Sequence, residues 1–192
     1  GDGDQLYTGA VTLQQNTTLN STGGTVTFDS TIDGAFSLTI NASAQFGGAG
    51  TGGGDFVGSS AALSSVAVNG LTTFNAAGDS ANDASVRTTG AQTYSMAATL
   101  NADIVLASDT MGQIQFGGNI LSGTQNAHGL TVNTAGTTQF QGGMVGPNPN
   151  ELQFLVTDDP AASAGQLGGT TEIIGTFNTF ENQTFNDAVV LT

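Results

Sequence analysis

The sequence predicts an all-β chain coiled as a right-handed parallel β-helix, that is, a β-solenoid of short strands. Apolar residues recur at period two in short runs, for example at Phe36, Leu38 and Ile40, a spacing typical of strands with one buried side. Gly, Asn, Asp, Ser and Thr flank these runs and favour tight turns. No apolar stripe at helical spacing persists over three turns, so helices are not expected.

A recurring motif divides the chain into long repeats. In each copy an aromatic residue follows Gln by two positions, and Ala and Leu follow the aromatic by three and six. The copies begin at Gln5, Gln92 and Gln183. Their aromatic residues are Tyr7, Tyr94 and Phe185, spaced 87 and 91 residues apart. We therefore expect one continuous solenoid segment over residues 1–192, with sequence repeats at 5–91 and 92–182 and a third opening at 183–192.

The repeat length leaves one alternative, a tandem array of β-sandwiches of roughly 100 residues each. Very short strands, Phe and Leu recurring at short intervals, and an end inside a repeated motif favour the solenoid, which can be cut between any two coils. In a solenoid Val, Ile, Leu and Phe would point inward as ladders. We expect Ala97 and Leu100 to face inward, with Tyr94 at a corner where its hydroxyl reaches solvent or a backbone group.

Composition restricts the partners. The formal net charge is -14, Lys is absent, and Arg87 is the only fixed positive charge. Binding to nucleic acid or to anionic membranes depends on Lys and Arg, so neither is expected, and no apolar run is long enough for a membrane helix. Stacked ladders of like charge would destabilise a solenoid, which accounts for a surface of Thr, Ser, Asn and Gln.

A family resemblance follows from the order of these segments. Gln-Thr-Tyr, Ala-Val-Thr-Leu, Thr-Val-Thr-Phe, Ser-Leu-Thr-Ile-Asn and Phe-Gly-Gly resemble the β-strand repeats of bacterial surface proteins, grouped with filamentous-haemagglutinin-like and autotransporter-like adhesins. The resemblance implies a secreted or cell-surface structural segment that forms a stiff rod or adhesin stalk. Its partners would be neighbouring repeats or identical subunits stacked end to end, and host or cell-surface glycans. It supplies no catalytic residues.

Two other functions remain open at this stage, a glycan- or protein-binding adhesin module and a polysaccharide-active β-helix enzyme. A lyase needs cationic groups to stabilise a carbanion, and a single Arg cannot supply them. A hydrolase needs two carboxylates at a defined separation. The carboxylate pairs that could be nominated are Asp29 with Asp33, Asp79 with Asp83, and Asp158 with Asp159, and nothing in the sequence distinguishes one of them. We therefore expect no enzymatic activity.

Calcium is the one metal that the sequence suggests, because it prefers carboxylate and carbonyl oxygens. Its weak candidate ligands are Asp2, Asp4, Asp158 and Asp159. The alternating Asp residues at the start lack the later ligands of a calcium loop, so solvated turn carboxylates are the favoured interpretation and no cofactor is expected. We expect His128 in a surface loop and Arg87 in an exposed pair with a carboxylate such as Asp83.

Overall fold

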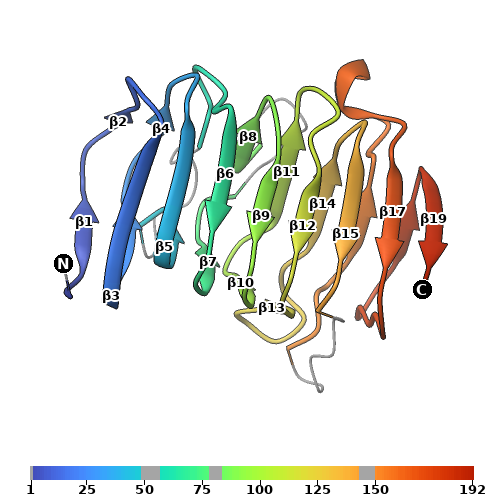
Figure 1. Cartoon of the computed structure of the whole chain (residues 1–192). Helices are drawn as coiled ribbons and strands as arrows, with labels where there is room; N and C mark the ends of the chain where they lie inside the picture. Colours follow the sequence, from blue (N-terminus) through green and yellow to red (C-terminus); the bar gives the residue numbers. More distant parts are fainter. Residues whose placement is uncertain (1, 49–56, 78–83, 143–149) are drawn as a thin grey trace.

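The computed structural model describes residues 2–48, 57–77, 84–142 and 150–192, and this part of the chain forms a parallel β-solenoid of about seven turns (Figure 1). Every pair of strands in these ranges is parallel. The two termini lie at opposite ends of the stack (Figure 1). Because β-sandwiches are built from antiparallel sheets, the prediction of a solenoid is confirmed and the sandwich alternative is wrong.

The coils build three faces, which the chain visits in the order 1, 2, 3. Face 1 contains residues 17–20 of β3 (Thr17–Phe28), residues 37–41 of β5 (Ser37–Phe46), β6 (Ser65–Val68), β9 (Gln92–Tyr94), β12 (Ile114–Phe116), β15 (Thr137–Phe140), β17 (Thr170–Ile173) and β19 (Ala188–Leu191). Face 2 contains β1 (Gln5–Tyr7), residues 25–28 of β3, residues 43–46 of β5, β7 (Thr72–Phe74), β10 (Ala98–Leu100) and β13 (Ile120–Ser122). Because β3 and β5 continue around the corner, faces 1 and 2 belong to one 12-stranded sheet.

Face 3 is made of strands of two to five residues. It contains β2 (Val11–Thr12), β4 (Ile32–Asp33), β8 (Val86–Thr88), β11 (Ile104–Ser108), β14 (Leu130–Asn133), β16 (Leu155–Thr157) and β18 (Gln183–Phe185). Isolated bridges through Val57 join β4 to β8. The described residues contain one helical turn, η1 (Ala164–Gln166), between faces 3 and 1. No helix in the described ranges is long and apolar enough to cross a membrane.

The period-two pattern becomes a set of inward ladders. Along β5, Leu38 and Ile40 are buried while Thr39 between them is half-buried, as expected where successive side chains point to opposite sides of a strand. Equivalent positions stack from coil to coil, so one row of face 1 runs through Leu19, Ile40, Val68, Tyr94, Phe116, Phe140, Ile173 and Leu191. Burial of each large apolar side chain contributes about 1.5–3 kcal/mol, and this shared core holds the coils together.

Stacked aromatic rings run through the core and change face halfway. Tyr7, Phe28, Phe46 and Phe74 stack on face 2, and Tyr94, Phe116 and Phe140 stack on face 1. The change occurs between Phe74 and Tyr94, whose rings meet edge to face with centroids 5.2 Å apart and planes at 75°. In the coil before the change, Phe74 on face 2 is accompanied by the aliphatic Val68 on face 1. In the coil after it, Tyr94 on face 1 is accompanied by the aliphatic Leu100 on face 2. On either side of the change, one aromatic and one aliphatic residue per coil keep the core at nearly constant volume, as close packing requires; in the next coil, Ser122 takes the face-2 position beside Phe116.

The three motif copies occupy three different faces. Gln5 begins β1 on face 2, Gln92 begins β9 on face 1 and Gln183 begins β18 on face 3. Each later copy therefore lies one face earlier in the coil, which also explains why the aromatic stack moves from face 2 to face 1. The motif marks the register of a strand, with Gln and the aromatic residue both on the inward side. It does not mark a fixed position around the coil.

The detailed expectations for the second copy are correct only in part. Leu100 is fully buried, as predicted. Ala97, by contrast, is half-buried in the turn before β10, and the next residue, Ala98, is the one that points inward. Tyr94 is fully buried and reaches neither solvent nor a backbone group.

Candidate functional site

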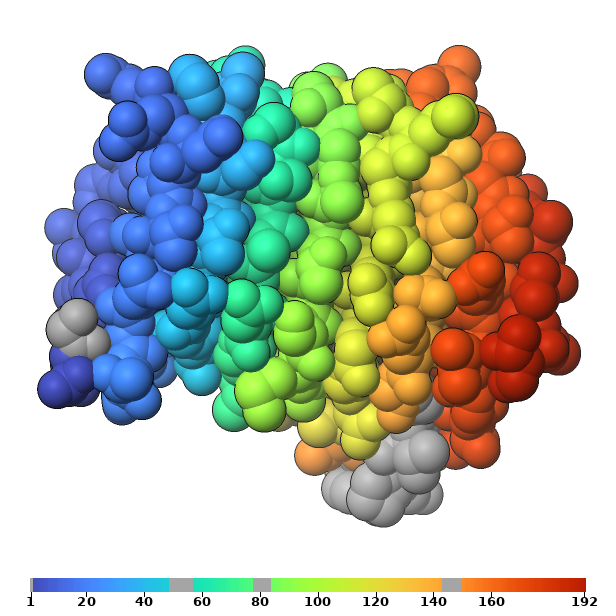
Figure 2. Space-filling view, in the orientation of Figure 1, coloured from blue at the N-terminus to red at the C-terminus, as the bar shows by residue number. Residues whose placement is uncertain are grey.

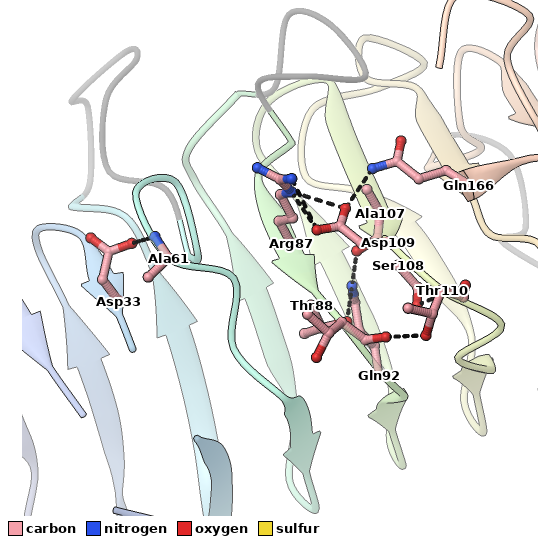
Figure 3. Close-up of polar contacts among 11 residues, drawn as sticks. Asp33, Ala61, Arg87, Thr88, Gln92, Ala107, Ser108, Asp109, Thr110 and Gln166 are labelled. Atoms are coloured by element: carbon pink, nitrogen blue, oxygen red, sulfur yellow. Dashed lines mark hydrogen bonds and ion pairs between the residues drawn. The ribbon is translucent and has the colours of Figure 1, made fainter. Parts of the chain in front are cut away.

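Gln92 and Tyr94 form a hydrogen-bonded pair inside the core. Both side chains are fully buried, and the Tyr94 hydroxyl donates to Gln92 Oε1 at 3.0 Å. Gln92 Nε2 donates to the backbone oxygen of Ala107 at 2.8 Å and to Thr88 Oγ1 at 3.2 Å (Figure 3). Burial raises the pKa of the Tyr94 hydroxyl, so the phenol stays neutral and donates a hydrogen bond. The pair ties face 1 to face 3 and has a structural role.

The first copy repeats the contact with less burial, and the third keeps only a bond from Gln to the backbone. At the first, the Tyr7 hydroxyl donates to Gln5 Oε1 at 3.2 Å, and Gln5 Nε2 donates to the backbone oxygen of Asn20 at 2.8 Å. At the third, Phe185 has no hydroxyl, and Gln183 Nε2 donates to a backbone oxygen instead. Because the copies lie on three faces, they do not form a common exposed surface that could bind a sugar.

Arg87 lies in a polar cluster on face 3. Its guanidinium forms a bidentate ion pair with the Asp109 carboxylate, with Nε 2.9 Å from Oδ1 and Nη2 2.9 Å from Oδ2. Gln166 of η1 donates to the same carboxylate at 2.8 Å (Figure 3). The partner is therefore Asp109, while Asp83, the carboxylate suggested by sequence, lies outside the described residues. Both side chains are partly exposed, at 38% and 23%, so solvent weakens the pair to less than about 1 kcal/mol.

Asp158 is the one strongly buried carboxylate among the calcium candidates, with 3% of its surface exposed. Its oxygens accept backbone N–H groups of Gly168 at 2.9 Å, Gly169 at 3.2 Å and Thr134 at 3.2 Å. Burial raises the pKa of the Asp158 carboxyl, these N–H groups oppose the shift, and the nearby Asp187 charge adds to it. The carboxylate thus fastens the connection between faces 3 and 1 onto the solenoid.

Asp159 and the two N-terminal candidates also bind neighbouring chain segments. The backbone N–H of Asp159 donates to Asn133 Oδ1, and its own Oδ1 caps the N–H of Ala161, both at 2.9 Å. Asp2 Oδ1 accepts from Thr22 Oγ1 at 2.5 Å, and Asp4 Oδ1 accepts from the N–H of Thr25 at 2.9 Å. Each carboxylate thus holds a turn in place, and Asp2 and Asp4 lie at the N-terminal coil, far along the chain from Asp158 and Asp159. Within the described ranges no three His, Cys, Asp or Glu side chains gather as a metal site.

The remaining described sequence candidates lie in turns or at the end of a strand. His128 lies in the connection between β13 and β14, where it is half-buried, and its N–H donates to Ser122 Oγ at 3.2 Å. Asp33 Oδ1 accepts the N–H group of Ser60 at 2.8 Å and that of Ala61 at 3.0 Å, the second of which Figure 3 shows. The carboxylate therefore caps a turn. Asp79 and Asp83 lie outside the described residues.

Ladders of amide side chains are a feature that sequence reasoning missed. At the corner between faces 1 and 2, Asn41 Nδ2 donates to Asn20 Oδ1 at 2.8 Å, and Asn69 Nδ2 donates to Asn41 Oδ1 at 2.7 Å. Further along face 1, Gln115 Nε2 donates to Gln141 Oε1 at 2.9 Å. The signal was present in the sequence, since Asn follows the end of three successive face-1 runs, but the pairing depends on which runs stack.

A polar groove lies against the Asn ladder at the first three coils. It measures about 440 Å³. Its lining carries hydroxyls, amides and small residues but no charge and no aromatic ring, and consists of Ser21, Thr22, Gly23, Gly24, Thr25, Asn41, Ala42, Ser43, Asn69 and Gly70. The bulge at residues 21–24, where the register between β3 and β5 shifts, raises one wall. Such a lining could hydrogen-bond a neutral polyhydroxylated molecule.

Comparison with known proteins gives no relative: no family model, no curated protein and no solved structure matches the chain significantly.

Proposed function

We propose that this chain is a structural rod segment of an extracellular surface or fibre protein, with a mechanical role and no catalytic step. The observation that carries the proposal is the open core at the last coil. Val189 and Leu191 stack in register on the buried Thr171 and the nearly buried Ile173, yet they are 41% and 76% exposed. Side chains at inward positions that remain exposed match a further coil, supplied by neighbouring repeats or by another subunit.

The backbone supports the same conclusion. The N–H of Thr192 donates to the carbonyl of Ile173 at 3.1 Å, and N–H groups alternate in direction along a strand. The N–H groups of Val189 and Leu191 therefore point away from β17, toward the open edge of β19. A parallel strand stacked there would satisfy them.

Substitution of Val189 by Pro tests this directly. Proline removes a donor, but only the one that faces the open edge, so the contacts between β19 and β17 are retained. We expect the purified chain to form end-to-end multimers in analytical ultracentrifugation and rods in electron micrographs, and Val189→Pro to shorten them strongly. Val189→Thr keeps the N–H and is the control. A wild-type chain that stays monomeric at every concentration, or multimers that Val189→Pro leaves unchanged, would contradict the proposal.

A glycan-binding adhesin module is a second candidate, favoured by the uncharged corner groove. Its lack of charge suits a neutral glycan better than an acidic one, which the net charge of -14 would repel. Gly70 lines the groove, and an added Cβ there would stand 2.4 Å from the backbone of Ala42. For a less disruptive test, Asn69→Leu should abolish any signal for neutral glycans on a glycan array. Asn101→Leu should not, because Asn101 pairs with Asn75 after β10 and β7 and does not line the groove. Retention of binding by Asn69→Leu would exclude the groove.

A further inference from the structure

Charge is distributed very unevenly around the solenoid. The 12-stranded sheet of faces 1 and 2 carries a single charged residue in its strands, Glu172 of β17. Most of the other described charges lie in the strands of face 3 or in the turns beside them, namely Asp29, Asp33, Arg87, Asp103, Asp109, Asp158, Asp159, Glu181 and Asp187. In the part of the chain that the structure describes, the strands of faces 1 and 2 are thus nearly neutral, and most of the charge lies along face 3.

Face 1 carries mainly hydroxyl and amide side chains on its outward side. It faces the viewer in Figure 1, and the space-filling view shows it as adjacent ridges that follow the coils (Figure 2). Its central outward row runs through Thr18, Thr39, Ala67, Thr93, Gln115, Gln139 and Glu172. Among the described connections, residues 158–169 leave from face 3, residues 123–129 from face 2, and residues 174–182 from the end of β17 on face 1. Nothing in the described strands of face 1 projects as an insertion.

The side chains of this face can recognise a copy of themselves. A hydroxyl and an amide each both donate and accept hydrogen bonds, so a face made of these groups is complementary to a second copy of itself. Gln113 and Gln115 already pair with Gln139 and Gln141 from coil to coil at 3.2 and 2.9 Å, which holds the amides in fixed orientations. Ladders of Asn and Gln between flat sheets are an established way of joining β-structures.

Electrostatics selects the same arrangement. Two copies that approach through face 3 would bring acidic sides together, whereas two copies that pair through face 1 keep face 3 out of the contact. We propose that face 1 is a lateral interface, through which two copies of this chain pair face to face about a two-fold axis. Such pairing would join rods side by side, and it does not depend on stacking at the coil ends.

The test is carried out in the Val189→Pro chain, so that lateral pairing is measured separately from end stacking. We expect a reversible dimer in sedimentation equilibrium that strengthens with salt, because salt screens the residual repulsion between the two acidic molecules. Thr93→Glu places carboxylates at the centre of the interface and should weaken dimerisation by at least about tenfold. Thr89→Glu adds the same charge at an exposed position beside β8 on face 3 and should leave the dimer intact. Circular dichroism checks that both variants fold.

Cysteine substitution gives an independent readout, because the chain contains no Cys. Thr39→Cys, Thr93→Cys and Gln139→Cys sample the length of face 1, and at least one of them should form a covalent dimer on oxidation with diamide, while Thr89→Cys should not. A monomer at all salt concentrations, equal effects of Thr93→Glu and Thr89→Glu, or cross-linking confined to Thr89→Cys would each overturn the proposal. If the Val189→Pro chain dimerises as described while the wild-type chain forms no rods, lateral pairing holds and end stacking fails.

Discussion

The buried Gln92–Tyr94 pair offers the sharpest test of how this solenoid is held together. Tyr94→Phe keeps the ring in its stack with Phe116 and removes only the hydroxyl that donates to Gln92 Oε1. The oxygen then remains buried without its donor, which costs about 1–3 kcal/mol. For a chain of 192 residues, each kcal/mol lowers Tm by about 2–4 °C. We therefore expect Tm to fall by about 2–12 °C in differential scanning calorimetry.

The first motif copy supplies the matched control. Tyr7→Phe removes the same hydroxyl from the same kind of pair, but Tyr7 and Gln5 are only half-buried. Water can replace the lost donor there, so the cost should stay below about 1 kcal/mol. In a double-mutant cycle with Gln92→Leu, Tyr94→Phe should cost less than it does alone, with a coupling of about 0.5–3 kcal/mol. Equal costs for Tyr7→Phe and Tyr94→Phe, or no coupling, would refute the assignment of the pair as a structural clamp.

Three further outcomes follow from the packing and the charges. Phe74→Ala, at the point where the aromatic stack changes face, should cost about 3–5 kcal/mol in guanidinium unfolding, whereas Phe180→Ala, with Phe180 63% exposed, should cost almost nothing; comparable losses would contradict the core assignment. The pKa of the Asp158 carboxyl is raised in the folded state. Ionisation of this group above that pKa therefore destabilises the folded chain, and the stability returns as the pH falls through it. Tm should rise on mild acidification from neutral pH, and a steady fall in Tm would exclude a net gain from Asp158. Calcium should shift Tm little relative to chelator, because the Asp158 oxygens already accept three N–H groups, and a rise of many degrees would disprove that expectation.

Much of the architecture could be predicted because it is local. Period-two runs with Gly and Asn turns specify short strands wherever they occur, and a nearly uncharged, Thr-rich outer surface is what stacked parallel strands tolerate. The inward positions of Leu38, Ile40 and Leu100 follow from alternation alone. The sequence could predict that Arg87 forms a partly exposed ion pair, but it could not predict which carboxylate takes part. Asp109 reaches Arg87 only because β11 stacks on β8.

The sequence by itself thus determined that this chain is a stack of short parallel strands around an apolar core. Only the tertiary structure decided which face each strand occupies. The three motif copies look equivalent in sequence, yet the turns between strands differ in length, and the copies fall on faces 2, 1 and 3. That offset depends on the accumulated path of the chain around the core, a sum of many turn geometries that no single motif encodes. The second copy lies inside the stack, between β6 and β12, where Gln92 and Tyr94 are completely buried, and the described strands of faces 1 and 2 contain one charged residue.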